Sequence, residues 1–352
     1  MTTSTKTVLV TGGTGFIAGW CIVELLRQGY RVRTTVRNLS REPASRTAIR
    51  DAVEADRYSE ERLSFLVADL MNDTGWEMAM TGCDYVLHVA SPLASGEAGP
   101  PEAIIAPARD GTLRVLKAAA RAGVQRVVMT SAAATARPPL TTDKVSDETI
   151  WADPADPQFD TYRVSKILAE RAAWDFMAGQ PAGGTTFTTI LPSAVFGPVL
   201  TKENLGSVRI IHGLLHGRPP GIPKIGLWIV DVRDLAALHV TAMIAPKAAG
   251  QRFIAAGDFM WMAEIAKTLR AHLDAAGEKV PSRPFPDFLV RALAVFSPNM
   301  RMLTPILGRK FLLTSEKARR VLGFSPRPAI TTIIECAESL LDTHRGSDFT
   351  QA

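Results

Sequence analysis

The stretch TVLVTGGTGFIA, residues 7–18, decides the fold, and the apolar run CIVELL at 21–26 follows it closely. The β-branched start predicts a strand, and the run after the glycines predicts a helix. Gly12 permits a tight turn between the two, and Gly15 lets a ligand approach the backbone closely. The amides and the positive dipole end of the helix then favour an anion such as phosphate. A turn that uses glycine only for its geometry is the alternative for this pattern taken alone.

Short β-branched runs alternate with helical patterns across the first half of the chain. This alternation is typical of an α/β fold with a doubly wound parallel sheet, the Rossmann architecture. The predicted strands are residues 7–10, 31–36, 63–67, 85–89, 126–129 and 185–191. The predicted helices are residues 15–28, 46–53, 101–122 and 161–177.

After residue 191 the regular alternation of predicted strands and helices ends. Prolines and glycines cluster at 217–226, and the strand-like segments 228–232 and 252–255 flank a predicted helix at 234–244. We therefore expect two domains. The nucleotide-binding Rossmann domain takes residues 1–191 and about 227–258, and a smaller, mostly helical substrate-binding lobe takes about 192–226 and 259–352. A lobe built this way forms a cleft against the carboxyl edge of the sheet, where ligands bind in such folds.

Composition excludes several classes of function. Of the 352 residues, 46% are hydrophobic and 21% charged, which argues against disorder. The net charge of +5 comes from scattered lysines and arginines. No basic run is interleaved with aromatic residues, so we expect no nucleic-acid partner.

Cysteine usage and hydropathy bear on location. Cys21, Cys83 and Cys336 are widely spaced and form no C-x-x-C pair, so neither a disulfide framework nor a thiolate metal site is expected. The chain start has no apolar signal-peptide region, and no apolar stretch reaches membrane-spanning length. We expect a cytoplasmic protein with no membrane partner.

The end of the second predicted strand indicates which dinucleotide binds. A preference for NAD needs an acidic residue there to bond the ribose 2′-hydroxyl, and no acid occurs between Tyr30 and Arg41. Arg37 stands at the strand end instead, and a guanidinium can bond a 2′-phosphate with two parallel hydrogen bonds. NADP(H) is therefore the predicted cofactor. The alternative for Arg37 is a solvated surface arginine.

Six motifs together carry a family resemblance. They are TGGTGFI at 11–17, TVR at 35–37, ADL at 68–70, HVASP at 88–92, YRVSK at 162–166 and VDVRD at 230–234. With them the chain resembles, from about residue 6 to 341, the extended short-chain dehydrogenase/reductase superfamily. Within it, the resemblance is to the dihydroflavonol reductase and cinnamoyl-CoA reductase branch, with its microbial aldehyde and ketone reductases.

The resemblance implies further cofactor contacts. Asp69 is expected to contact the adenine amine and Leu70 the adenine edge, while Val89 to Ser91 line the cofactor. Pro192 to Val195 are expected to meet the nicotinamide amide through backbone groups. Ordinary loop chemistry is the alternative for each of these, and a capping role is the alternative for Asp69. The cofactor-binding residues of the glycine turn are Gly12, Gly15, Phe16 and Ile17.

Tyr162 and Lys166 are the candidate catalytic pair. They lie four residues apart on a predicted helix, so their side chains share one face. A tyrosine with its ordinary pKa of about 10 is a reluctant proton donor at neutral pH. A nearby ammonium and the positive charge of oxidised nicotinamide are expected to lower that pKa. Tyr162 then protonates the alkoxide that forms as hydride arrives, and Lys166 holds the nicotinamide ribose and helps relay the proton. An accidental Tyr and Lys on a helix surface is the alternative.

The sequence departs from the family pattern at two positions. Ala18 replaces the third glycine of the turn, where a methyl group is the smallest possible intrusion. The serine that normally hydrogen-bonds the substrate carbonyl is replaced by Ala132 in the run Thr-Ser-Ala-Ala at 130–133. Ser131 can take over only if the strand ends and turns there, because neighbouring strand residues face opposite sides. Ser131 is therefore a third catalytic candidate, on the condition that the strand turns there.

Two other constellations are weaker. His212 and His216 have a helical metal-ligand spacing but lack a glutamate and a third ligand, so no metal site is predicted. Asp231 and Asp234 flank Arg233, which favours a helix cap with an ion pair over paired catalytic carboxylates.

The predicted activity is reversible NADPH-dependent reduction of an aldehyde or ketone to an alcohol. The substrate is a small carbonyl or alcohol, and the protein is a monomer or homodimer. Two alternatives stay open: an NAD-dependent nucleotide-sugar epimerase or dehydratase, and an NADP(H)-binding sensor without catalysis, which Ala132 motivates. An apolar or aromatic substrate is suggested by Pro138, Pro139, Ile150, Trp151, Leu205, Ile210 and Leu214.

Overall fold

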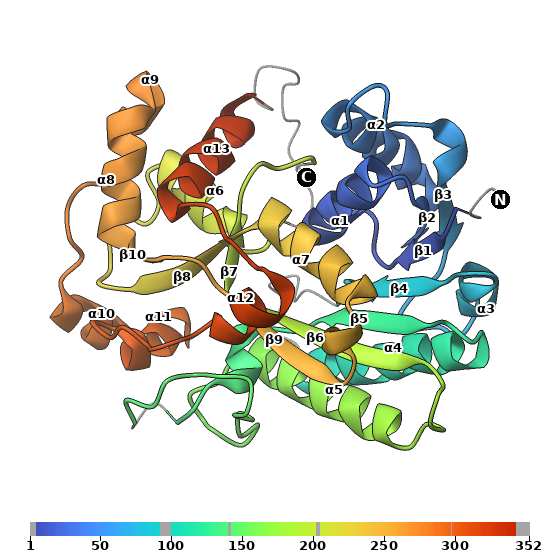
Figure 1. The fold of residues 1–352 in the computed structure, drawn as a ribbon. Coiled ribbons are helices and arrows are strands. Elements are labelled where there is room, and N and C mark those ends of the chain that lie inside the picture. Colours follow the sequence, from blue (N-terminus) through green and yellow to red (C-terminus); the bar gives the residue numbers. More distant parts are fainter. Residues whose placement is uncertain (1–4, 92–99, 140–141, 202–204, 297, 343–352) are drawn as a thin grey trace.

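A computed structural model describes residues 5–91, 100–139, 142–201, 205–296 and 298–342 (Figure 1). Its main element is a seven-stranded sheet in the order β3-β2-β1-β4-β5-β6-β9, in which all neighbours are parallel. The order reverses between β1 and β4, which is the switch point where ligands bind in doubly wound sheets. The predicted fold class is confirmed. The strands are β1 (Thr7–Val10), β2 (Arg31–Val36), β3 (Leu63–Val67), β4 (Tyr85–His88), β5 (Arg126–Thr130), β6 (Thr186–Pro192) and β9 (Gln251–Ala255).

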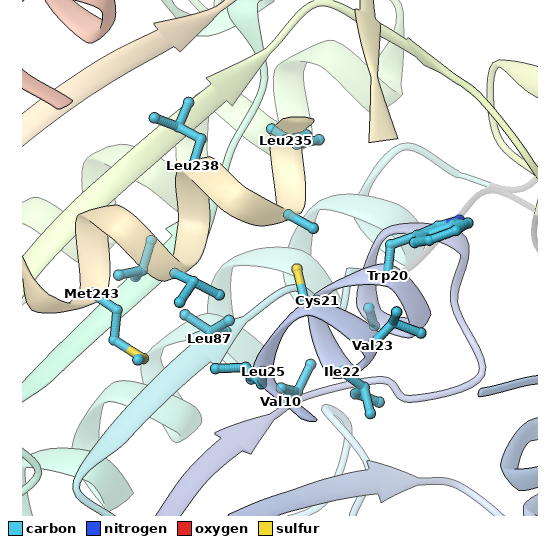
Figure 2. Packing of buried hydrophobic residues seen from close by; sticks show 14 of the residues in the cluster. Val10, Trp20, Cys21, Ile22, Val23, Leu25, Leu87, Leu235, Leu238 and Met243 are labelled. Atoms are coloured by element: carbon cyan, nitrogen blue, oxygen red, sulfur yellow. The ribbon is translucent and has the colours of Figure 1, made fainter. Parts of the chain in front are cut away.

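Helices cover both faces of this sheet (Figure 1). On one face α1 (Phe16–Arg27) packs against α7 (Val232–Ile244), with α2 (Glu42–Ala52) beside α1. Figure 2 shows this core, in which Cys21 and Leu25 of α1 lie close to the side chains of α7. The other face carries α3 (Trp76–Met80), α4 (Glu102–Arg121) and α5 (Thr161–Ala178).

Strand β1 shows how the sequence sets up these two cores. Val8 and Val10 belong to the core under α1 and α7, whereas Leu9 belongs to the core under α4 and α5. The side chains of a strand alternate between faces, so a strand that is covered on both faces needs an unbroken apolar run.

A smaller sheet begins the second part of the chain. Strands β7 (Ala194–Phe196), β8 (Gly226–Asp231) and β10 (Phe259–Trp261) form it in the order β10-β8-β7. It shares a core with α6 (Val208–Leu215), α8 (Met262–His272) and α13 (Ala329–Asp342). The remaining helices are α9 (Asp274–Glu278), α10 (Asp287–Leu293), α11 (Pro298–Leu303) and α12 (Glu316–Leu322).

This small sheet refines the expected path of the chain. The segment predicted as a strand at 228–232 is β8, which pairs with β7 and β10, and it is β9 that returns to the large sheet. β7 and β10 have three residues each, too few to show a period in the sequence. The exact division into two domains stays a prediction. No helix in the described ranges is long and apolar enough to cross a bilayer.

Candidate functional site

The glycine turn between β1 and α1 has the geometry that its sequence predicts. Gly12 has a φ of +77°, and a Cβ there would lie 3.0 Å from the Cβ of Ala90. A Cβ at Gly13 would lie only 2.2 Å from Thr34 Oγ1, so packing alone explains this glycine. Gly15 precedes α1 with no side-chain cap, and the first turn of α1 contains no acidic residue. The free amides at this helix start are suited to a phosphate.

Thr11 and His88 link the end of β1 to the end of β4 through hydrogen bonds. Thr11 Oγ1 accepts hydrogen bonds from the backbone amides of Val89 (3.0 Å) and Ala90 (2.9 Å). The hydroxyl proton is therefore donated to His88 Nδ1, 3.0 Å away, and the Nε2–H of His88 faces Thr112 Oγ1 at 3.3 Å. Burial, with the charge of Lys166, lowers the pKa of His88 to about 3. His88 is thus a neutral structural group that holds the switch point.

Sequence reasoning missed the role of Thr11, although a threonine directly before the glycine turn was a usable signal. Its hydroxyl fixes the backbone of residues 89 and 90, next to Ser91, along which the cofactor is expected to lie. The cofactor contacts of Val89 and Ser91 stay predictions. The HVASP motif ends at Pro92, which lies outside the described residues.

Arg37 follows the end of β2 and is exposed. Within the described part of the chain its side chain forms no hydrogen bond or ion pair. The strand end is tied to the glycine turn, because Thr35 accepts hydrogen bonds from the amides of Gly12 (3.1 Å, at Oγ1) and Gly13 (2.9 Å, at the carbonyl). Arg37 is therefore free to bind an anion near the turn, and its choice of the 2′-phosphate stays a prediction.

Asp69 and Leu70 lie in the loop that follows β3. Asp69 Oδ1 accepts the amide of Met71 at 3.0 Å, so the local capping role is present. The side chain of Leu70 packs directly over Gly111 of α4, where a Cβ would lie 2.7 Å from Leu70 Cβ. Gly111 thus lets the loop approach α4, a contact that no local sequence pattern indicates. The adenine contacts of Asp69 and Leu70 stay predictions.

The candidate catalytic pair lies at the start of α5. Asp160 caps this helix by accepting the amide of Arg163 at 2.7 Å, and Tyr162 and Lys166 follow on one face. Lys166 Nζ lies 5.9 Å from the centroid of the Tyr162 ring. Lys166 is only 5% exposed, and neither polar end group has a hydrogen-bond partner among the described residues. The buried ammonium of Lys166 and the hydroxyl of the half-buried Tyr162 are thus left available to a ligand.

The electrostatics of the pair differ in part from expectation. Burial lowers the pKa of Lys166 to about 8, although the charge of Glu170 opposes this. Burial and the charge of Asp160 raise the pKa of Tyr162 above its ordinary value, and Arg163 opposes them. The expected lowering of the Tyr162 pKa is therefore absent from the protein alone, because burial and the charge of Asp160 raise it.

Ser131 serves the scaffold. Strand β5 keeps its alternation past its end: Thr130 Oγ1 is 2.8 Å from His239 on α7, whereas Ser131 Oγ donates to Glu170 Oε2 on α5 at 2.6 Å. Ser131 is buried, and the chain stays extended through Ala132. This placement corrects the idea that Ser131 turns toward the substrate carbonyl, because its hydroxyl is committed to Glu170.

A buried ion pair that the sequence did not reveal stands behind the site. Glu170 accepts Arg252 Nε at 2.9 Å and Thr189 Oγ1 at 2.8 Å. Arg252 Nη1 donates to the carbonyls of Glu148 and Ile150, at 2.9 and 2.7 Å. The pair thereby ties α5, β6, β9 and the loop around residue 150 together.

Pro192 to Val195 connect the two sheets. β6 ends at Pro192, the amide of Ser193 donates to the carbonyl of Ala255 at 2.9 Å, and β7 begins at Ala194. The segment thus lies at the carboxyl edge of the large sheet, as its expected nicotinamide contact requires. That contact stays a prediction.

The other sequence constellations are structural. Asp231 caps α7 and binds Arg233 through two parallel hydrogen bonds of 2.9 and 2.7 Å, as predicted. His216 Nδ1 lies 2.7 Å from the carbonyl of His212, and the two rings are stacked with centroids 4.3 Å apart. Across the described ranges, no group of three or more His, Cys, Asp or Glu side chains is arranged to hold a metal.

Two side chains expected on the substrate wall are used elsewhere. The ring of Trp151 lies under the guanidinium of Arg252 at 3.7 Å, and Leu214 is fully buried in the core of the second part.

Comparisons with known proteins agree with this architecture. The model of the NAD dependent epimerase/dehydratase family matches residues 8–256. Ketoreductase azaE of Aspergillus niger is 32% identical over 360 residues, which cover 96% of this chain and 98% of the relative. Tetraketide alpha-pyrone reductase 1 of Arabidopsis thaliana is 33% identical, covering 79% and 82%. Cinnamoyl-CoA reductase 1 of Oryza sativa subsp. japonica is 36% identical, covering 75% of each chain.

Solved structures show the same fold. Gre2 of Candida albicans, in complex with NADPH, matches with a TM-score of 0.79 at 24% identity. The match covers 96% of this chain and 99% of that chain. Vestitone reductase from alfalfa matches with a TM-score of 0.69, also at 24% identity, covering 96% and 99%.

Proposed function

Because the chain belongs to the NAD dependent epimerase/dehydratase family, the extended short-chain dehydrogenases/reductases, we propose that it reduces an aldehyde or ketone with NADPH. The observation that carries the proposal is the pair Tyr162 and Lys166 at the start of α5, in which Lys166 is buried beside the half-buried Tyr162 and neither polar end has a hydrogen-bond partner among the described residues. The relatives named above are reductases, which favours reduction over nucleotide-sugar epimerisation or dehydration.

The residues present fit a dinucleotide with a 2′-phosphate. The uncapped start of α1 offers amides to the pyrophosphate, and Gly12 and Gly15 leave the backbone open to it. Arg37 offers an exposed, unpaired guanidinium to the 2′-phosphate. The charge of Lys166 contributes to the lowered pKa of His88 at the end of β4. When bound, the cofactor supplies the hydride that reduces the carbonyl carbon.

Tyr162 supplies the proton in this scheme. Its high pKa keeps the hydroxyl protonated at neutral pH, so the group is ready to donate to an alkoxide oxygen. The ammonium of Lys166, 5.9 Å from the Tyr162 ring, stabilises the tyrosinate that is left. In the alcohol-oxidising direction the same tyrosinate accepts the proton. The low exposure of Lys166 strengthens this interaction, because little water screens it.

Ala132 limits the rate. The position offers no hydroxyl to the developing oxyanion, and loss of one such donor typically costs about a hundredfold to a thousandfold in turnover. The proposed enzyme is thus slow relative to family members with a serine there. This same substitution is the observation behind the second candidate, an NADP(H)-binding sensor without catalysis.

A substrate panel tests the proposal. The purified protein is incubated with NADPH and with aromatic aldehydes, aliphatic ketones, methylglyoxal and isovaleraldehyde, and the fall in NADPH absorbance is compared with the alcohol formed. We expect one alcohol per NADPH and much weaker activity with NADH. Tight NADPH binding without turnover on any carbonyl supports the sensor instead. Copurification with tightly held NAD supports an epimerase or dehydratase. The cytoplasmic location and the monomeric or homodimeric state stay predictions.

A further inference from the structure

Arg137 carries a guanidinium of which one edge is buried and has no hydrogen-bond partner among the described residues. It follows the 3-10 helix Ala133–Ala136, which begins directly after Ala132. Both Nε and Nη2 are shielded from solvent, and neither has a hydrogen-bond partner in the part of the chain that the structure describes. These two nitrogens form one edge of the guanidinium, on which their N–H bonds point the same way.

Two aromatic rings enclose this group. The centre of the guanidinium lies 4.3 Å from the centroid of the Phe311 ring and 5.6 Å from that of Phe159. Rings of this kind attract the cation through their faces but offer no oxygen to its N–H groups. The hydrogen-bonding capacity of the edge is left unused.

Four charged side chains face Arg137 from neighbouring segments. Arg163 and Arg309 repel its charge, whereas Asp156 and Asp160 attract it. Asp160 is already used by Arg163, whose Nη1 donates to it at 2.6 Å. Burial, with Arg163, lowers the pKa of Arg137 to about 10, so the group is still cationic at neutral pH. Asp156 and Asp160 thus act on Arg137 through their charge, and neither forms a hydrogen bond with this edge.

The same edge holds a carboxylate elsewhere in the protein. Arg233 bonds Asp231 through Nε at 2.9 Å and Nη2 at 2.7 Å. Arg252 bonds Glu170 through the same two nitrogens, at 2.9 and 3.3 Å. An arginine buried without such a partner is costly, and a bound anion removes that cost.

The position of Arg137 connects it to the candidate active site. It lies five residues after Ala132, the position of the family's carbonyl-binding serine. The negative charge of Asp160, the cap of α5, raises the pKa of Arg137 and so favours its charged form. Phe159, one of its two rings, lies three residues before Tyr162. The segment after Ala132 therefore carries Arg137, and the segment before Tyr162 carries a ring that lies beside its guanidinium.

We infer that Arg137 binds a carboxylate of the substrate, at a distance from the carbonyl that is reduced. The substrate class is then an oxo acid whose apolar or aromatic body lies against Phe159 and Phe311. This inference rests on the proposed reductase function and narrows its substrate. Both rings are partly exposed, so they can rotate to admit the carboxylate to the shielded edge.

A matched pair of substrates tests the inference. The wild-type protein and the variants Arg137→Met and Arg137→Lys are assayed with 4-carboxybenzaldehyde and with its methyl ester. We expect the wild type to prefer the acid in kcat/KM by about tenfold to a hundredfold, the range for hydrogen bonds to a charged group. Arg137→Met should lose this preference while keeping activity on the ester. Arg137→Lys should keep only part of it, because an ammonium lacks the two-pronged edge.

Arg309→Met is the matched control. Arg309 is exposed and lies over the same Phe311 ring at 5.8 Å, so this variant removes a neighbouring positive charge without touching the buried edge. We expect the ratio of acid to ester to change by less than about threefold, since solvent screens an exposed charge. An equal fall in both variants would mean that general charge, not Arg137, sets the preference, and would overturn the inference.

Calorimetric titration with benzoate provides a readout without turnover. The protein with NADP+ should bind benzoate, and Arg137→Met should bind it at least about tenfold more weakly while Arg309→Met does not. If benzoate binding is unchanged in Arg137→Met, the carboxylate site is wrong even when carbonyls are reduced. If no carbonyl is reduced but benzoate binding depends on Arg137, the reductase function fails and the anion site stands.

Discussion

Helix α5 carries two kinds of buried polar group, one helical turn apart. Glu170 is fully buried and accepts hydrogen bonds from Ser131, Thr189 and Arg252. Lys166 is nearly as buried but has no hydrogen-bond partner among the described residues. A buried polar group whose bonds are all made holds the structure together, whereas one left unpaired is available to a ligand. The contrast separates the scaffold of this site from its chemistry.

Removal of the Tyr162 hydroxyl should have the largest effect. Tyr162→Phe keeps the ring but removes the proton donor, so we expect kcat to fall by about a hundredfold to ten-thousandfold. The melting temperature should hardly change, because the hydroxyl has no partner to lose. Tyr30→Phe, in the core beside α1, is the control and should leave kcat unchanged. A Tyr162→Phe variant with normal turnover would remove Tyr162 from the mechanism.

Removal of the Glu170 carboxylate should lower the stability of the fold, whereas removal of the Tyr162 hydroxyl lowers kcat. Glu170→Ala leaves Arg252 charged and buried without its partner, and we expect a loss of about 3–5 kcal/mol in the free energy of unfolding. Asp175→Ala, an exposed position on the same helix, should change stability by less than about 0.5 kcal/mol. Urea unfolding measures both. A Glu170→Ala protein that is as stable as the wild type would show that the network contributes nothing to the scaffold.

The same contrast explains what the sequence could predict. The large sheet was predictable because its strands are short apolar runs between clear helical patterns, as at residues 7–18. Tyr162 and Lys166 were predictable because a spacing of four residues places them on one helix face whatever surrounds them. These features depend on local sequence alone.

Features that depend on distant partners were not predictable. Glu170 and Arg252 lie 82 residues apart, and the packing of α5 on β6 together with the pairing of β6 with β9 brings them together. The role of Ser131 depended on which element would cover its face of the strand, so its motif position was misleading. The unpaired edge of Arg137 is likewise visible only when every neighbour is in place.

The pH dependence of reduction tests the unpaired state of Lys166. Its pKa is lowered to about 8, so the side chain loses its proton as the pH rises through that value. The Tyr162 pKa is raised, so Tyr162 deprotonates later. We therefore expect kcat/KM to be level below about pH 8 and then to fall by up to about tenfold per pH unit. A level profile through pH 9.5, or the same inflection in Lys166→Met, would contradict this assignment.

A serine restored at position 132 should increase activity. Ala132→Ser returns a hydroxyl to the position where the family binds the substrate carbonyl, and we expect turnover to rise by about tenfold or more. Ala134→Ser, two residues on and within the 3-10 helix Ala133–Ala136, is the control and should not raise it. An unchanged rate in Ala132→Ser would mean that another group already supplies the hydrogen bond.

Ser131→Ala gives the smallest expected effect on activity and separates scaffold from chemistry most directly. The variant removes one of the donors to Glu170, which should cost about 1–3 kcal/mol of stability, measured by urea unfolding. Turnover should stay within about threefold of the wild type, because the Ser131 hydroxyl faces α5 and the ion pair. If turnover falls a hundredfold while stability is unchanged, the Ser131 hydroxyl contacts the substrate. The separation between Glu170 and its partners as scaffold and Lys166 as chemistry would then be wrong for Ser131.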